Sequence, residues 1–120
     1  MIWSRRQIKT APGCVFCAIV AGRSPAHIEE RTRDALLFRP IDPVTPGHLL
    51  AIPLTHVARF HSDPRVTGRI MEQAARWAQD DEPNYNIIVN TGSHAGQTVF
   101  HLHVHLVPRW PQDGLVMPWD

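Results

Sequence analysis

The sequence predicts an α+β fold in which an antiparallel meander sheet carries a short N-terminal helix and one longer helix packed on it. The predicted elements follow the order helix, strands, helix, strands, which suits a sheet with a helix on one face. The chain has 120 residues, 43% of them hydrophobic and 19% charged, and this is enough for one domain with one core. We assign the domain to residues 14–110, between an N-terminal tail, 1–13, and a C-terminal tail, 111–120.

The short helix follows the polar N-terminal tail, which we expect to be loosely held. Residues 14–20 suit one or two helical turns, and Gly22 then offers the left-handed conformation in which helices often end. No apolar run is long enough for a signal peptide or a spanning helix, so we expect a cytoplasmic protein with no membrane partner. In that compartment Cys14 and Cys17 are not expected to form a structural disulfide.

Two strands are predicted next, at residues 35–38 and 48–53. The first is a short apolar run typical of a buried strand, and the second ends at a proline. The connection between them, residues 39–47, contains three prolines and a glycine and is predicted to turn. The two strands are therefore expected to pair in antiparallel fashion.

The longer helix is predicted to begin at Pro64. Ser62 and Asp63 can cap it, and proline is favoured at the first helical position. Apolar residues recur on one face at helical spacing: Val66, Ile70, Ala74, Trp77 and Ala78. This face is expected to pack on the sheet, and the helix is predicted to end within residues 80–83.

Two further strands, at residues 85–90 and 99–108, are joined by a loop of small residues. In the second, three histidines alternate with apolar residues. Successive side chains of a strand point to opposite faces, so His101, His103 and His105 are predicted to share one face while the apolar residues reach the core.

This row of histidines indicates a functional site. Same-face neighbours on a strand lie about 6.6 Å apart, and the outer pair about 13 Å apart. Two neighbours could share a small ion, but placing all three on one tetrahedral zinc would require a strong bend. The spacing therefore favours separate roles. The alternative is an ordinary solvated face, and we favour function because histidine serves as acid, base, nucleophile and ligand.

The loop at residues 90–98 leads back to the histidines and suits an anion. Gly92 and Gly96 allow the backbone to approach a ligand closely, and Asn90, Gln97 and Thr98 add neutral donors. An ordinary connecting loop is the alternative. The net charge of +1 gives no reason to expect a nucleic-acid partner.

The Cys14-x-x-Cys17 pair has three interpretations: a redox pair, half of a metal site, or two reduced core thiols. A redox pair usually follows a strand of a βαβ unit, and the chain before Cys14 offers none. A metal site needs two further ligands from elsewhere in the chain.

The sequence resembles the histidine triad (HIT) family of nucleotide hydrolases and transferases. Five blocks carry the resemblance, in order and at family-like spacing: residues 14–22, 45–53, 89–92, 95–100 and 101–107. A third histidine rather than glutamine, and no long C-terminal domain, make the chain similar to the small hydrolase branch. The resemblance implies the HIT-like fold.

The resemblance also implies a mechanism. His103 would be the nucleophile that attacks the α-phosphorus of a nucleoside phosphoramidate or dinucleoside polyphosphate and forms a nucleotidyl-histidine. His105 would contact the phosphate and assist the leaving group, and His48 would complete that hydrogen-bond system. Phosphate oxygens would be held by Asn90, Gln97 and Thr98. A non-catalytic nucleotide-binding or interaction protein on the same fold is the alternative.

The resemblance further implies a structural zinc bound by two thiolates and two imidazoles. The ligands would be Cys14, Cys17, His56 and His101. No organic cofactor is expected. The expected partners are a purine nucleoside monophosphate conjugate as substrate and a second copy in a homodimer. A catalytic metal on the histidine row is disfavoured, because no carboxylate lies in or beside that row.

One departure from the family concerns ribose. Many relatives carry an acid after the strand at residues 35–38, where it binds the ribose hydroxyls; this chain has Pro40 there, and Asp42 follows two positions later. The helix and the connection that follows it, residues 64–84, also look shorter than in most relatives. In those relatives this region often supplies a dimer contact. Trp119 is predicted either to lie near a site or to belong to an unattached tail.

Overall fold

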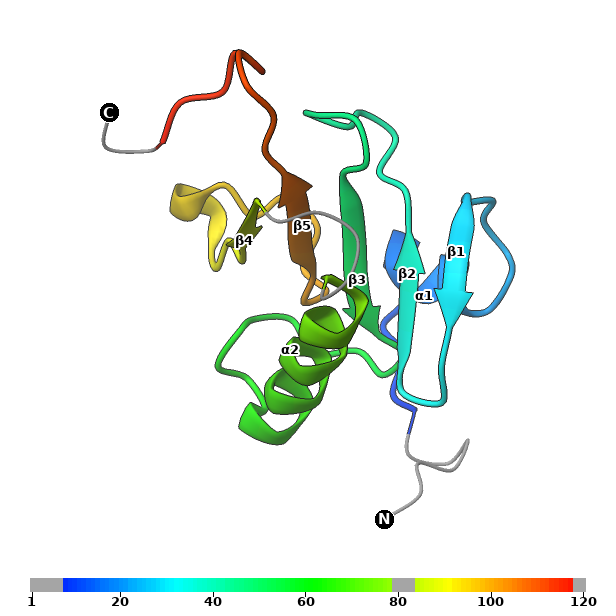
Figure 1. Cartoon of the computed structure of the whole chain (residues 1–120). Helices are drawn as coiled ribbons and strands as arrows, with labels where there is room; N and C mark the ends of the chain where they lie inside the picture. Colours follow the sequence, from blue (N-terminus) through cyan, green and yellow to red (C-terminus); the bar gives the residue numbers. More distant parts are fainter. Residues whose placement is uncertain (1–7, 79–83, 118–120) are drawn as a thin grey trace.

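The computed structural model describes residues 8–78 and 84–117. Within them, five strands form one antiparallel sheet in the order β1-β2-β3-β5-β4 (Figure 1). The elements are α1 (Val15–Val20), β1 (Ile28–Arg31), β2 (Ala35–Phe38), β3 (Leu49–Pro53), α2 (Pro64–Ala78), β4 (Tyr85–Ile88), the 3₁₀ turn η2 (Ser93–Ala95) and β5 (Val104–Pro108). The predicted α+β class is confirmed.

Each face of the sheet is covered by a different helix. One cluster joins α2 to the sheet, and its buried members are Ala35, Leu37, Ala51, Ile70, Ala74, Leu102, Val104 and Leu106. The other joins α1 to the opposite face, through Phe16, Ile19, Leu36, Phe38, Leu50, Ile52 and Leu54. Because β2 is buried on both faces, it shows an unbroken apolar run rather than alternation.

The start of α2 is as predicted. The carboxylate of Asp63 accepts hydrogen bonds from the backbone N–H groups of Arg65 (3.1 Å) and Val66 (3.4 Å), which have no partner within the helix. Val66, Ile70 and Ala74 are buried, and Ile70 and Ala74 belong to the cluster that joins α2 to the sheet. The predicted end in residues 80–83 lies outside the described residues. No helix in the described part of the chain has both the length and the apolar character needed to cross a membrane.

The strand that carries the histidines is shorter than predicted. It begins at Val104, so His101 and His103 lie in an extended segment before β5. The backbone of this segment has partners outside the sheet: the N–H of Leu102 donates to Val57 (2.7 Å), and the carbonyl of His101 faces the His103 ring (2.8 Å). The alternation of faces nevertheless persists, because Leu102 packs in the same cluster as Val104.

Strand β1 was not predicted from the sequence. Its four residues are all exposed, so it lacks the apolar pattern of a strand. It forms one edge of the sheet by pairing with β2. Smaller differences are that β3 begins at Leu49 and β4 ends at Ile88.

The described part of the N-terminal tail is attached to the domain, contrary to expectation. Ile8 packs beside the α1 cluster. The N–H of Lys9 donates to the Thr55 hydroxyl (2.7 Å), and the carbonyl of Lys9 accepts from the N–H of His56 (2.8 Å). These are backbone contacts, which the polar composition of the tail does not reveal. The domain limits at residues 14 and 110 remain a prediction.

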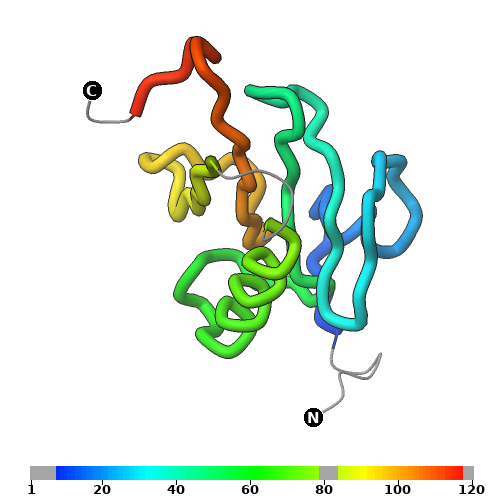
Figure 2. The backbone as a smooth tube through the Cα atoms, viewed as in Figure 1, coloured from blue at the N-terminus to red at the C-terminus, as the bar shows by residue number. Residues whose placement is uncertain are grey.

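The segment after β5 is held by Arg109, which donates to both carboxylate oxygens of Asp113 (2.8 and 3.1 Å) and to the side chain of Asn86 on β4 (2.7 Å). Hydrogen bonds from Arg109 hold the pKa of Asp113 well below its usual range. This segment and the β2–β3 loop lie at the same end of the sheet (Figure 2), where the Trp110 indole N–H donates to Pro46 (3.1 Å). Trp119 lies outside the described residues.

Candidate functional site

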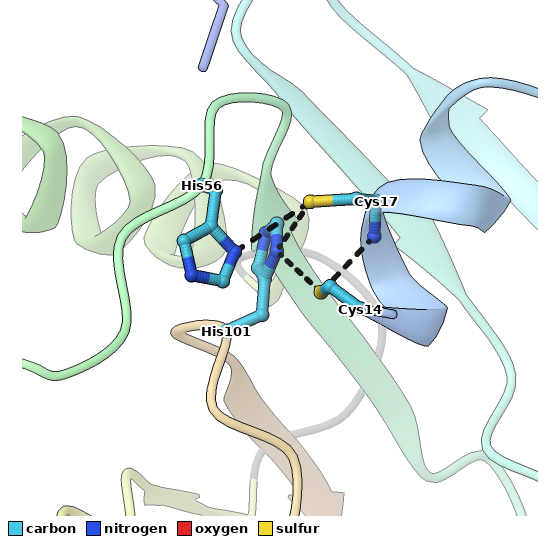
Figure 3. A group of neighbouring side chains, drawn as sticks. All are labelled: Cys14, Cys17, His56 and His101. Atoms are coloured by element: carbon cyan, nitrogen blue, oxygen red, sulfur yellow. Dashed lines mark hydrogen bonds between the residues drawn. The ribbon is translucent and has the colours of Figure 1, made fainter. Parts of the chain in front are cut away.

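Four sulfur and nitrogen ligands converge where α1 meets the segment before β5. Cys14 and Cys17 come from the start of α1, His56 from the loop after β3 and His101 from the segment before β5 (Figure 3). Their ligand atoms all lie within 4.8 Å of one another. The Nδ1 atom of His101 is 3.5 Å from the sulfur of Cys14 and 3.6 Å from that of Cys17, and His56 Nδ1 is 3.5 Å from Cys17.

This Cys₂His₂ cluster fits a zinc ion. A tetrahedral zinc with bonds of about 2.3 Å to sulfur and about 2.0–2.1 Å to nitrogen separates those atoms by about 3.5–3.6 Å. The observed separations agree with this value. His101 is fully buried, and its Nε2–H donates to the carbonyl of Pro53 at 2.9 Å. That bond leaves the lone pair of Nδ1 directed to the thiols, an arrangement common in metal-binding histidines.

The surroundings favour the protonation states that a metal needs from its imidazoles. Burial lowers the pKa of His101 to about 4 and also lowers the pKa of His56, so both rings are neutral at pH 7. Burial raises the pKa of the Cys17 thiol. A bound cation would favour the thiolate and reverse that last shift.

A second group of histidines forms a hydrogen-bonded chain. The backbone N–H of Val44 donates to Nδ1 of His48 at 3.1 Å, so the proton of His48 is on Nε2. Nε2 of His48 lies 3.0 Å from Nδ1 of His105 and donates to it. The proton of His105 is therefore on its own Nε2. Burial lowers the pKa of His48, and burial together with the neighbouring His103 and His48 lowers that of His105 to about 4.

His103 has the opposite arrangement of its ring nitrogens. Its Nδ1–H donates to the carbonyl of His101 at 2.8 Å, which leaves Nε2 without a proton. His103 is 8% exposed, and burial is the main cause that lowers its pKa. Its centroid lies 5.2 Å from that of His105. The phenyl ring of Phe16 meets His103 edge-on, with centroids 5.2 Å apart and planes at 87°.

The Gln97 side chain forms hydrogen bonds to the backbone of its own loop and of a neighbouring segment. Its carbonyl accepts from the N–H of Gly92 (2.8 Å), and its amide donates to the carbonyls of Ala58 (2.7 Å) and Val99 (3.1 Å). Gln97 is 3% exposed, and both of its amide protons are used. It therefore holds the loop in shape. The phosphate-binding role that the family resemblance implies for Gln97 stays a prediction.

Asn90 and Thr98 remain available to a ligand. In the described part of the chain neither side chain has a hydrogen-bond partner, and Thr98 is exposed. Gly96 has φ of 93°, and a Cβ there would lie 3.7 Å from Nδ2 of Asn90. Glycine thus lets the loop return over Asn90 at a backbone angle that other residues rarely adopt.

A cleft of about 840 Å³ adjoins the second histidine group. The β2–β3 loop supplies much of its wall, including Arg39 and Pro40, and His48 and Trp110 also line it. We call it the His48 cleft. Its volume lies within the usual range for small-molecule sites. Asp42, the acid nearest to Pro40 in the sequence, is exposed and is not part of the lining.

Sequence reasoning missed several contributors to the site. Phe16 lies between the two cysteines in the sequence, and an aromatic residue inside that motif was the available signal. The N–H of Val44 and the carbonyl of Pro53 orient histidines through the backbone. Backbone groups leave no mark in the residue types, so only a structure identifies them.

Comparison with known proteins supports the resemblance seen in the sequence. The model of the HIT domain family matches residues 21–112. The adenosine 5′-monophosphoramidase of Saccharomyces cerevisiae is 35% identical over 109 residues, which cover 88% of this chain and 69% of the relative.

Two solved structures are similar throughout the fold. A HIT family protein from Bacillus anthracis superposes with a TM-score of 0.79 at 33% identity, covering 92% of this chain and 84% of the other. A zinc-bound histidine triad family protein from Mycobacterium smegmatis gives a TM-score of 0.74 at 40% identity, with coverage of 87% and 80%. The second neighbour shows that a protein of this architecture binds zinc.

Proposed function

This chain belongs to the HIT family, and we propose that it is a nucleotide hydrolase that cleaves nucleoside phosphoramidates or dinucleoside polyphosphates at the α-phosphorus. The reaction would pass through a covalent nucleotidyl-histidine on His103. The similarity to an adenosine 5′-monophosphoramidase supports this substrate class, and adenosine conjugates are the substrates to test first.

The observation that carries the proposal is the distribution of protons over the histidines. The carbonyl of His101 accepts a hydrogen bond from the Nδ1–H of His103, so Nε2 of this neutral ring carries no proton. A neutral imidazole with an unprotonated nitrogen is the form that acts as a nucleophile. The chain from Val44 through His48 places the proton of His105 on Nε2. One ring thus offers a lone pair, and its neighbour offers a proton.

The two rings suffice for a balanced double displacement. Binding of the phosphate anion first brings a second proton onto His105, which becomes an imidazolium. Nε2 of His103 then forms a bond to the α-phosphorus while the bond from phosphorus to the leaving nitrogen or oxygen breaks, and His105 gives its Nε2 proton to that atom and becomes neutral. Water then attacks the same phosphorus and gives a proton to His105, and the bond between phosphorus and His103 breaks. Nucleoside monophosphate leaves, and both imidazoles return to their starting forms.

Phosphate binding is proposed for the loop at residues 90–98 and for His105. Asn90 and Thr98 are free to donate to phosphate oxygens, and the Nε2–H of His105 is a third donor. Gln97 contributes by fixing the loop that carries them. Binding of the anionic phosphate favours the protonated form of His105 and so helps proton transfer to the leaving group.

We assign a structural role to a zinc ion at the Cys₂His₂ cluster. Zinc bound there would supply a cross-link between α1 and the segment before β5, because protein atoms fill all four tetrahedral positions. His101 belongs to this cluster and also orients His103 through its carbonyl, so the cluster positions the nucleophile. Two thiol ligands require a reducing compartment, which supports a cytoplasmic location.

A homodimer is the assembly we propose. In the described sheet β4 is an edge strand, and its Ile87 and Ile88 are 43% and 39% exposed. Val116 lies beside this edge, in a groove that it shares with β4 residues, and is 78% exposed. A second copy would cover these apolar side chains.

Pro40 favours a second candidate, a nucleotide-binding protein without turnover, because the usual acid of the ribose site is missing. Turnover of adenosine and guanosine phosphoramidates and dinucleoside polyphosphates separates the two candidates. Hydrolysis is expected in the wild type and should be lost in His103→Ala, which should still bind nucleotide. If the wild type binds nucleotide but turns over none of the panel, the binding function replaces the proposed hydrolysis.

A further inference from the structure

The His48 cleft holds a carboxylate that the steps above do not use. Glu29, on β1, lines the cleft together with Pro40 and His48, and it is the acidic residue among the described residues of the lining. It comes from the edge strand that the sequence pattern does not reveal. The cleft adjoins the proposed phosphate site, because His48, which lines the cleft, contacts His105 directly.

A β-bulge positions Glu29. In the pairing of β1 with β2, Ile28 lies opposite Phe38 while Glu30 lies opposite Leu37. Two steps along β1 therefore match one step along β2, and Glu29 is the extra residue. Bulges bend a strand and redirect a side chain, and they are frequent beside binding sites. Here the redirected side chain is the one that reaches the cleft.

The carboxylate of Glu29 is held through a single oxygen. Arg39 Nε donates to Oε1 at 2.6 Å, and His27 Nε2 lies 3.3 Å from the same atom. In the part of the chain that the structure describes, no side chain bonds Oε2. The side chain is 33% exposed. Since an ionised carboxylate has about four acceptor positions, the group is oriented by Arg39 and still able to accept from a ligand.

We propose that Glu29 accepts the ribose 2′- and 3′-hydroxyls of the bound nucleotide and so determines specificity for ribonucleotides. A vicinal diol offers two adjacent O–H donors, which match the free acceptor positions of one carboxylate. Arg39 is a positioning residue that acts through Glu29. Pro40 has no side-chain acceptor, and Asp42 lies outside the cleft lining. The inference rests on the proposed function, because that function supplies the nucleotide.

The test is equilibrium binding of AMP and 2′,3′-dideoxy-AMP, measured by calorimetry on the full chain. Hydrogen bonds to a charged group are worth about 10- to 100-fold in affinity, so the wild type should prefer AMP by that factor. Glu29→Gln should bind the two nucleotides within about threefold of each other, with unchanged affinity for the dideoxy form. The matched control is Glu30→Gln, the same change one residue along β1, and it should keep the wild-type preference.

Equal affinity of the wild type for both nucleotides, or a preference that survives in Glu29→Gln, would overturn the assignment. So would loss of affinity for AMP and its dideoxy analogue alike in the variant, because that pattern indicates a structural role. Turnover is measured separately. Diol-dependent binding without hydrolysis would retain the role of Glu29 at the ribose and remove the hydrolase function. Hydrolysis without a preference for the diol would retain the hydrolase function and remove the role of Glu29.

Discussion

Four histidines of the site, His48, His101, His103 and His105, each have their proton placed by a neighbouring atom. The carbonyl of Pro53 accepts a hydrogen bond from the Nε2–H of His101, and the carbonyl of His101 accepts one from the Nδ1–H of His103. The N–H of Val44 sets the tautomer of His48. Residues with the same side chain therefore have different chemistry. The proposed chemistry of each histidine therefore depends on these backbone and side-chain contacts as well as on the residue type.

Removing the donor to His105 tests this view. His48→Ala deletes the Nε2–H that bonds Nδ1 of His105, so the tautomer of His105 is no longer set. We expect kcat for an adenosine phosphoramidate to fall by about 10- to 100-fold, at or below the lower end of the roughly 10²- to 10⁴-fold that a direct proton transfer contributes, because His48 acts through His105. His48→Asn, which keeps an N–H donor, should recover part of the loss. The exposed His61→Ala is the control, and an equal loss there would contradict the explanation.

The low pKa of His105 predicts a stability loss in acid. The value is about 4 in the folded chain, against about 6.5 for a free imidazole, so the unfolded state binds more protons between those values. Stability should therefore fall as pH decreases from about 6.5 to about 4. Because the ring is partly exposed, solvent screening reduces the effect to on the order of 1–2 kcal/mol. Urea unfolding of the wild type and His105→Asn checks this: the variant should depend less steeply on pH, and parallel curves would refute the prediction.

At the scale of elements, a six-residue helix needs support from outside itself. Isolated helices shorter than about 12 residues are marginal, and α1 spans six residues, Val15–Val20. Its buried face packs on the sheet through Phe16 and Ile19, Cys14 caps its N-terminus, and Cys17 lies in its first turn. The proposed zinc would therefore fix α1, and with it the aromatic ring that packs on His103.

Loss of the thiols should release the metal and loosen this helix. The wild type should contain about one zinc per chain by elemental analysis, and Cys14→Ser/Cys17→Ser should contain almost none. The free energy of unfolding should fall by several kcal/mol, because binding energy at a structural zinc contributes to folding. Val15→Ser, an exposed position between the cysteines, is the matched control. Undiminished zinc in the double variant would exclude this site.

The elements also show what a sequence can and cannot reveal. β2 and the start of α2 have strong local signals, an apolar run and a capped proline, and they lie where predicted. β1 has no such signal, because its edge position leaves every side chain exposed. The same limit applies to the site. The histidines and cysteines follow from their spacing and the family resemblance, whereas Glu29 reaches the cleft through a bulge that no residue pattern marks.

The whole molecule is arranged so that loops from distant parts of the chain meet at one end of the sheet. Thr45, from the β2–β3 loop, donates to the carbonyl of Pro108 at 2.9 Å, and Trp110 bonds Pro46 nearby. These contacts close the wall of the His48 cleft. The opposite edge of the cleft comes from β1, so the site is complete only in the folded sheet.

The exposed edge at β4 predicts the assembly. Ile87→Glu should convert a dimer into a monomer, as measured by light scattering, because it places a charge in the proposed contact. Ile28→Glu is the matched control: it introduces the same change at the other edge of the sheet, at an isoleucine that is 46% exposed. A wild type that is monomeric at all concentrations, or a dimer that survives Ile87→Glu, would remove the β4 interface.

The most direct test of the central claim is mass spectrometry of the protein quenched during a single turnover of an adenosine phosphoramidate. We predict an adduct with the mass of one adenylyl group, located on the peptide that contains His103 and absent from His103→Ala. Because water resolves the adduct, it should form and decay faster than, or together with, the release of AMP. Turnover that proceeds without the adduct, or an adduct on another residue, would contradict the assignment of His103 as the nucleophile.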